Sequence, residues 1–431
     1  MLIYVLVLML VFLLLIAYSS SGQDFFYPWV IAVASFLNSA FLAMLNLNLW
    51  QFGFHAETCL VIVAALLMFG LGAMLASHFC VRAVGGQALE QTKKIFDIPP
   101  WIPVTVFLVL LVLAAVVFQN MYVLSMEHGN VMGIRGVLST IRKLIEARLL
   151  ALPKLQIYCS ILAMPTAVYF TYAFFCNLFR RHFSRSNILY LLPLFGYVPH
   201  IVLSTGRIEF LSITVMVIMM AGFLYQERYG ISLKSNMRIL SLIVVALTIF
   251  FGTFLVVGSF TWKGVSLERG PFKILSHYSG AQMPAFDVFL QSHYPDDEWI
   301  GRHTLLGAYG NLGSLGAEVP PTSMFLEFTH FTSVDTNVYT SLRRYIQDYG
   351  YAGMAMLMFL MGMIYTTCYH FVRSGRGGLF GLLMYLILAW PLFMLAHDDM
   401  LLTGYASTRI VYYMAVMGLW CFCLKRYRKA L

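Results

Sequence analysis

Arginines at the ends of apolar segments are the side chains in this sequence best suited to chemistry on an anion. Arg207 lies between two apolar segments, and Arg343 and Arg344 precede another. A guanidinium group binds phosphate oxygens through a planar pair of donors. An arginine at membrane depth is costly and usually faces a cavity or a partner. The pattern therefore indicates a phosphate-containing ligand where these segments end, unless Arg207 is a structural residue that pairs with Glu209.

The two adjacent arginines differ in the neighbours that a helix would give them. Arg344 and Asp348 are four residues apart, a spacing at which side chains meet on a helix. Arg343 shares a face with Tyr339 and has no acidic residue at helical spacing. We therefore expect Arg343 to contact the ligand and Arg344 to form an exposed ion pair with Asp348.

The remaining polar candidates have less specific patterns. The acidic run at 296–298 is more typical of a solvated loop tip than of a metal site, and the histidines are not spaced as metal ligands. No Walker, GxSxG or HExxH motif is present. The sequence therefore predicts no metal and no cofactor. His397 is a candidate general base, and Arg302 is a candidate ligand contact.

The elements that must position these residues are membrane helices. The 431 residues are 60% hydrophobic and only 11% charged, and apolar runs long enough to cross about 30 Å of hydrocarbon recur along the chain. We predict one all-α polytopic membrane domain over residues 1–431, with about eleven transmembrane helices and a range of roughly ten to twelve. The helices are expected near 1–18, 26–46, 58–79, 101–122, 157–178, 187–204, 207–225, 237–258, 350–371, 378–396 and 405–424.

Basic residues set the orientation of these helices. They follow the last helix and occur in alternate loops, as the positive-inside rule requires of cytoplasmic segments. We therefore place the C-terminus in the cytoplasm, and Arg207, His397 and the loops 123–156 and 259–349 on the outer side. The basic residues are Arg82, Lys93, Lys94, Arg180, Arg181, Arg185, Arg228, Lys234, Arg238, Arg373, Arg376, Lys425, Arg426, Arg428 and Lys429.

The two outer loops carry different patterns. The loop 259–349 is too long for a simple connection and is rich in aromatic residues, so we expect it to be ordered and to carry the site. The loop 123–156 contains apolar residues at helical spacing between Ile134 and Leu149. We expect this amphipathic helix to lie flat at the membrane interface. It is either an anchor on lipid headgroups, or it uses Arg135 and Arg142 to hold a lipid-linked phosphate.

The end of the long loop resembles a known family. The pattern is similar to the loop exit of bacterial oligosaccharide repeat-unit polymerases, the Wzy or O-antigen polymerase family. Gly206-Arg207 between two helices and Tyr278-Ser279-Gly280 early in the loop also resemble that family. The residues of the exit are Thr336, Asn337, Val338, Tyr339, Thr340, Arg343, Tyr345, Asp348, Tyr349, Gly350 and Gly353.

The resemblance implies an inner-membrane glycosyltransferase with a GT-C-like architecture. Such an enzyme joins oligosaccharide repeat units carried on undecaprenyl diphosphate into O-antigen or capsular polysaccharide, on the periplasmic side and without a metal. Donor and acceptor are both lipid-linked oligosaccharides, membrane lipids surround the enzyme, a chain-length regulator protein is a possible partner, and no nucleic acid is involved. The catalytic residues would be Arg343, Arg207 and the base His397, and the substrate-binding residues Arg135, Arg142, Tyr278, Arg302, Asn337 and Tyr339.

Two other activities share this layout. An O-antigen ligase would transfer the finished glycan to lipid A core. A transporter or flippase would move lipid-linked sugars across the membrane, although the sequence lacks the internal repeat that transporters often show.

Overall fold

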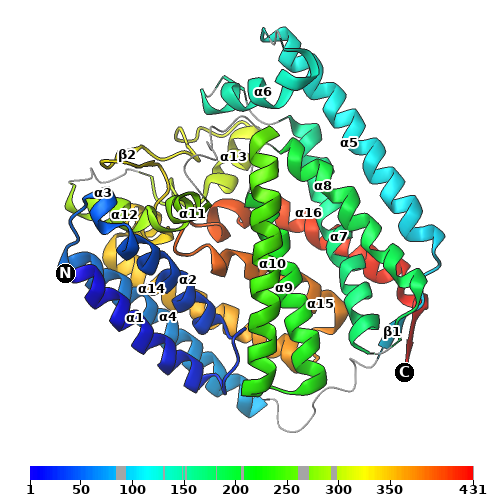
Figure 1. The fold of residues 1–431 in the computed structure, drawn as a ribbon, viewed down its shortest axis with the longest axis horizontal. Helices are drawn as coiled ribbons and strands as arrows, with labels where there is room; N and C mark the ends of the chain where they lie inside the picture. Colours follow the sequence, from blue (N-terminus) through cyan, green and yellow to red (C-terminus); the bar gives the residue numbers. More distant parts are fainter. Residues whose placement is uncertain are drawn as a thin grey trace. The chain divides into compact units, whose positions relative to one another are not determined.

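The chain is built almost entirely from α-helices in a computed structural model (Figure 1), which describes residues 1–83, 94–129, 132–147, 149–150, 153–180, 182–204, 208–260, 271–292 and 299–430. The helices are α1 (Leu2–Ser20), α2 (Pro28–Leu45), α3 (Leu47–Trp50), α4 (Ala56–Ala83), α5 (Trp101–Glu127), α6 (Val137–Glu146), α7 (Lys154–Phe179), α8 (Leu192–Leu203), α9 (Ile208–Tyr229), α10 (Leu233–Phe260), α11 (Pro271–Gly280), α12 (Gln282–Gln291), α13 (Leu306–Ser314), α14 (Ser341–Arg373), α15 (Gly378–Phe393) and α16 (Thr408–Cys423).

Shorter elements complete the fold. Two strand pairs are antiparallel: β1 (Lys94–Phe96) with β4 (Arg428–Ala430), and β2 (Thr329–His330) with β3 (Asp335–Thr336). The short turns are 3-10 helices at Gly133–Gly136 (η2), Arg185–Leu191 (η3) and Lys425–Tyr427 (η6), and a π-helix at Leu401–Tyr405 (η5).

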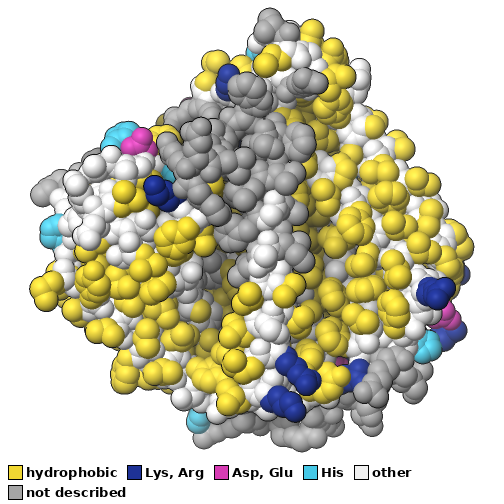
Figure 2. All heavy atoms as spheres, viewed as in Figure 1, with side chains coloured by type: hydrophobic (Ala, Val, Ile, Leu, Met, Phe, Trp, Pro, Cys, Tyr) yellow, Lys and Arg dark blue, Asp and Glu magenta, His cyan; other side chains and the backbone are white. Residues whose placement is uncertain are grey.

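Within the described residues, eight helices are long and apolar enough to cross a membrane. They are α1, α2, α4, α5, α7, η3 together with α8, α9 and α14, and the shorter α15 and α16 are also apolar. Figure 2 shows hydrophobic side chains over the outer faces of α1 and α5, where Leu8 is 69% and Val112 is 62% exposed. These features confirm an all-α chain of the multipass membrane type. Each of the eleven predicted helices overlaps a helix of the structure, and the number of crossings stays a prediction.

The chain divides into two compact units. The first unit contains Met1–Leu89, Leu267–Gly381 and Leu388–Val411. The second unit contains Glu90–Ser266, Leu382–Ile387 and Tyr412–Leu431. The candidate residues of the long loop and of α14 therefore all belong to the first unit.

The packing of α14 against α4 fixes the frame of the first unit. A side-chain carbon added at Gly72 would collide with the backbone of Phe359, and one added at Gly362 would collide with the backbone of Phe69. The two helices therefore approach as closely as small residues permit. At Gly350 the backbone leaves helical geometry with φ of 65°, a conformation that favours glycine. This break makes residues 341–349 a separate segment, which agrees with the predicted start of a membrane helix near 350.

Contacts within the first unit group its loops at two ends. At one end Asp24, which follows α1, accepts a hydrogen bond at 2.7 Å from Arg373, the last residue of α14. At the other end Ser341 donates its backbone N–H to the carbonyl oxygen of Leu395 at 3.0 Å, and Asp287 of α12 accepts a backbone hydrogen bond from His55 at 2.8 Å. This grouping places these loops at two ends of the unit, and the side of the membrane that each end faces stays a prediction.

The second unit shows the same grouping. At one end Asn177 bonds both the N–H and the carbonyl of Phe96, at 2.9 and 2.7 Å, and Arg180 pairs with Glu227 at 3.0 Å. At the other end α8 stops at Leu203, and α9 begins at Ile208, close to the predicted break in the apolar run.

The amphipathic helix of loop 123–156 is present as η2 and α6, and part of its apolar face packs against α5. Val137 and Ile141 are fully buried against Val117 and Met121 of α5. These two residues of the apolar face are thus covered by protein, because α5 extends far enough to receive them, and the position of the helix at the membrane interface stays a prediction. Ile134 remains 69% exposed at the start of the segment.

The predicted alternation yields a topology that reporter fusions can check. We expect a phosphatase inserted at Ser292 to be active in the periplasm and a fluorescent reporter fused after Lys429 to fold in the cytoplasm. A cytoplasmic signal from Ser292 would contradict both the orientation and the outer location of the site.

Candidate functional site

Arg344, in the first turn of α14, is enclosed by partners from three other segments. Its side chain is 1% exposed, and it donates Nε and Nη2 to the two carboxylate oxygens of Asp398 at 2.6 and 3.1 Å. It also donates Nη1 to the carbonyl oxygen of His303 and Nη2 to that of Met324, both at 3.0 Å. Its fork therefore binds protein groups, as a buried guanidinium must.

The predicted ion pair between Arg344 and Asp348 is wrong. Asp348 accepts the backbone N–H and the hydroxyl of Thr304, at 2.8 and 2.7 Å, and the N–H of His303 at 3.0 Å. The spacing rule for helices fails because the long loop folds back onto α14 and supplies donors to Asp348. Asp398, 54 residues after Arg344, takes the place of Asp348.

Arg343 has a different environment although it is the next residue. Its guanidinium carbon lies 3.8 Å from the ring centre of Tyr339 and 4.9 Å from that of Phe289. It is 1% exposed and pairs with Glu327, whose side chain is 56% exposed. The contact between Arg343 and Tyr339 is confirmed, although Tyr339 precedes α14. Arg343 has no acidic residue at helical spacing, as predicted, and its carboxylate partner Glu327 comes from 16 residues upstream.

The loop after α15 supplies a buried acid next to Asp398. Asp399 is 1% exposed and accepts hydrogen bonds from the Tyr345 hydroxyl at 3.0 Å and from the N–H groups of Leu401, Leu402 and Thr403. Burial raises the pKa of Asp399 to about 6, against the opposite effect of these donors. Asp399 thus fixes the turn that presents Asp398 to Arg344.

His397, the predicted general base, lies beside these acids. Its Nδ1 atom is buried and has no hydrogen-bond partner in the described part of the chain. Burial lowers the pKa of His397 to about 4, so the ring is neutral at pH 7. A proton would have to be accepted in surroundings that disfavour the charge. The role of His397 as a base stays a prediction.

The long loop brings four other predicted contacts into the first unit. Tyr339 exchanges a hydrogen bond of 2.6 Å with the Thr329 hydroxyl and donates to the carbonyl oxygen of Glu327 at 3.1 Å. Asn337 is half-buried between β3 and Tyr339. These contacts position the strand pair beside Arg343.

Tyr278 and Arg302 lie on other parts of the loop. Tyr278 is 40% exposed on α11, and its neighbour His277 bonds the carbonyl oxygen of Asp335 at 3.0 Å, which ties α11 to β3. Arg302 donates Nε to the carbonyl oxygen of Pro321 at 3.2 Å. Tyr278 is therefore linked to the Arg343 segment through the strand pair, whereas Arg302 braces the loop.

The other predicted residues are not brought to this site by the described contacts. Arg207 and the acidic run 296–298 lie outside the described residues, as does the side chain of Arg135. Arg142 is half-buried on α6 of the second unit. The predicted residues that the described contacts bring together are therefore those around Arg343.

Sequence reasoning missed the carboxylates that surround the two arginines. Asp398 and Asp399 stand in a short loop after an apolar helix, where acids without local partners indicate a buried pairing. Glu327 has no such signal, because it lies in the middle of a loop without periodicity.

Comparison with protein-family models, with curated proteins and with solved structures gives no match for this chain.

The environment of Arg344 predicts a structural role with a large effect. Removing one member of a buried ion pair leaves the other charge unpaired and costs about 3 to 5 kcal/mol. We expect Arg344→Ala to lower the free energy of unfolding of the purified protein by this amount, and Asp398→Asn to act in the same direction. The exposed Arg409→Ala is the control. Equal stability of the Arg344 and Arg409 variants would contradict the role.

Proposed function

We propose that this protein is a glycosyltransferase of the bacterial inner membrane that joins oligosaccharide repeat units carried on undecaprenyl diphosphate. The observation that carries the proposal is the contrast between the two arginines. Arg344 is held by two backbone carbonyl oxygens and by both oxygens of Asp398, which is 19% exposed, while Arg343 is held by aromatic rings and by Glu327, a carboxylate that is 56% exposed and can leave. Arg343 is thus preorganised for an incoming diphosphate, which would take the place of Glu327.

The aromatic rings support this assignment. A guanidinium that stacks on aromatic faces keeps its edge, with its donors, directed away from the rings. Tyr339 and Phe289 both lie within 5 Å of the Arg343 carbon, so rotation of the fork is restricted. Such fixed donors stabilise charge that develops in a transition state without reorganising.

The reaction follows from these positions. The acceptor hydroxyl oxygen attacks the anomeric carbon of the donor glycan, and a new glycosidic bond forms as the bond to the phosphate oxygen breaks. The departing undecaprenyl diphosphate keeps the electron pair, and Arg343 stabilises its charge. We propose that Glu327, displaced from Arg343, takes the proton of the acceptor hydroxyl. Its exposure makes it more accessible to an acceptor than the buried nitrogen of His397.

The products of a deletion strain distinguish this activity from its alternatives. A polymerase mutant keeps a single repeat unit on lipid A core and loses the ladder of longer glycans. A ligase mutant loses all repeat units from the core, and a transporter mutant accumulates lipid-linked glycan on the inner side.

Variants of Arg343 test the role of the fork. Arg343→Ala should raise the activation free energy of polymerisation by about 3 kcal/mol, as for other preorganised charge stabilisers. The rate should therefore fall roughly a hundredfold. Arg343→Lys should restore only part of the rate, because lysine keeps the charge and loses the planar fork. Glycan length and amount are compared at matched protein levels, with Arg409→Lys as the control. A normal ladder of glycan lengths in the Arg343→Ala strain would contradict the role assigned to Arg343.

Variants of Glu327 test the proton acceptor. Glu327→Gln keeps the size of the side chain and cannot accept the proton, so we expect polymerisation to fall by about 10² to 10⁴-fold. Glu327→Asp should keep part of the activity. Glu318→Gln, an exposed acid in the same loop, is the control. If Glu327→Gln polymerises as fast as the wild type, Glu327 only occupies Arg343 in the resting state and another group is the base.

A further inference from the structure

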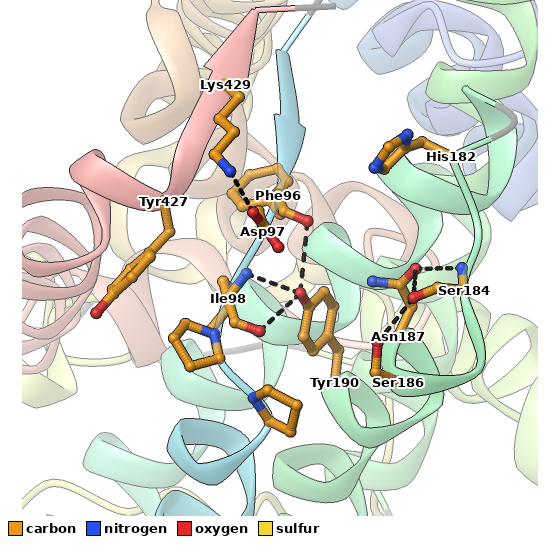
Figure 3. A pocket seen from close by; sticks show the side chains of 12 residues that line it. Phe96, Asp97, Ile98, His182, Ser184, Ser186, Asn187, Tyr190, Tyr427 and Lys429 are labelled. Atoms are coloured by element: carbon orange, nitrogen blue, oxygen red, sulfur yellow. Dashed lines mark hydrogen bonds and ion pairs between the residues drawn. The ribbon is translucent and has the colours of Figure 1, made fainter.

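A preformed polar pocket lies in the second unit, and none of its lining residues belongs to the site assigned above. Its volume is about 430 Å³, and Figure 3 shows that its walls come from β1 and the residues after it, from the segment before α8, and from the C-terminal strand. The polar side chains among its lining residues include His182, Ser184, Ser186 and Lys429. Such a concave site with a few convergent polar groups is typical of ligand binding.

Hydrogen bonds hold the walls in place. The Tyr190 hydroxyl accepts the N–H of Ile98 at 2.8 Å and donates to its carbonyl oxygen at 3.0 Å. Asn187 accepts the N–H of Ser184 at 2.7 Å, and the Ser184 hydroxyl contacts that of Ser186 at 2.7 Å. The pocket therefore exists before a ligand arrives, and little ordering is needed on binding.

The charge around the pocket favours an anion. Lys429 lines the pocket and pairs with Asp97, and both side chains are about 60% exposed, at 62% and 60%. Arg185, Lys425 and Arg426 stand exposed on the segments that carry the pocket walls. An exposed ion pair contributes little, so Lys429 can exchange Asp97 for a phosphate oxygen.

Exposed apolar side chains adjoin the polar lining. Trp101 directly follows the lining residue Pro100 and is 63% exposed, and Phe183 and Ile188 are 44% and 53% exposed. Tryptophan at a helix end is typical of the level of lipid headgroups. A polar pocket with apolar side chains beside it matches a phospholipid, with its headgroup inside and its acyl chains along the helices.

We propose that this pocket binds the headgroup of an anionic phospholipid. Lys429 and His182, with the hydroxyls of Ser184 and Ser186, hold the phosphate. Asp97, released from Lys429, accepts hydrogen bonds from headgroup hydroxyls, as a glycerol headgroup offers. Basic pockets beside membrane helices are suited to such lipids, and the predicted orientation places this one at the cytoplasmic leaflet, where anionic lipids would meet it.

Lipid titration of the purified full chain tests the site. By native mass spectrometry in detergent, we expect phosphatidylglycerol to bind more tightly than phosphatidylcholine with the same acyl chains. Lys429→Gln should weaken the binding of phosphatidylglycerol about fivefold, the effect of one cation near a headgroup. The binding of phosphatidylcholine should stay unchanged. Lys154→Gln, an exposed lysine at the other end of α7, is the matched control.

A second variant and a soluble probe complete the test. Ser186→Glu places a negative charge at an exposed position of the lining and should abolish the preference for phosphatidylglycerol while the unfolding temperature stays the same. The site would be overturned if Lys429→Gln and Lys154→Gln lost the same affinity for phosphatidylglycerol. It would also be overturned if Lys429→Gln and Ser186→Glu both kept the preference for phosphatidylglycerol over phosphatidylcholine. Displacement of the lipid by an equal concentration of soluble glycerol phosphate would also overturn it, because the acyl chains would then contribute nothing.

Discussion

The buried ion pair between Arg344 and Asp398 is the constraint on which the rest of the candidate site depends. A guanidinium with 1% exposure must have its donors satisfied, since an unmatched charge in such surroundings is strongly unfavourable. The carbonyl oxygens of His303 and Met324 complete its set of acceptors. One side chain thereby ties the start of α14 to the long loop and to the turn after α15. Asp399 supports the same turn through backbone N–H groups.

This constraint fixes the position of Arg343. Adjacent residues on a helix point in different directions, so the anchoring of Arg344 leaves Arg343 facing Tyr339 and Phe289. Two adjacent guanidinium groups with the same charge are therefore held in different environments. Arg344 is neutralised by Asp398, whose side chain is 19% exposed, and Arg343 by Glu327, whose side chain is 56% exposed on a loop. Arg343 can exchange its more exposed carboxylate for another anion without opening the fold, as the proposed binding of a diphosphate would require.

Local patterns in the sequence predicted the helices and the contact of Arg343 with Tyr339, but not the carboxylate partners of the two arginines. The break after Leu203 and the break at Gly350 were visible because apolar runs and turn residues are local signals. The prediction that Arg344 pairs with Asp348 failed because it assumed that the nearest charged residue on the same helix is the ion-pair partner. Asp398 lies 54 residues away and meets Arg344 only through the tertiary fold. The burial of Val137 and Ile141 was missed for the same reason. It depends on a tertiary contact, because these residues pack against α5, which extends beyond the apolar run.

The most direct test of the account is reconstitution of the chemistry with the chain alone. Purified protein in lipid vesicles receives lipid-linked repeat units in the presence of excess chelator, and released undecaprenyl diphosphate is measured together with glycan length. The account predicts one lipid diphosphate released for each repeat unit joined, with release greatly slowed by Arg343→Ala in a protein that remains folded. Glycan growth without release of lipid diphosphate, or equal release by the Arg343→Ala protein, would contradict it.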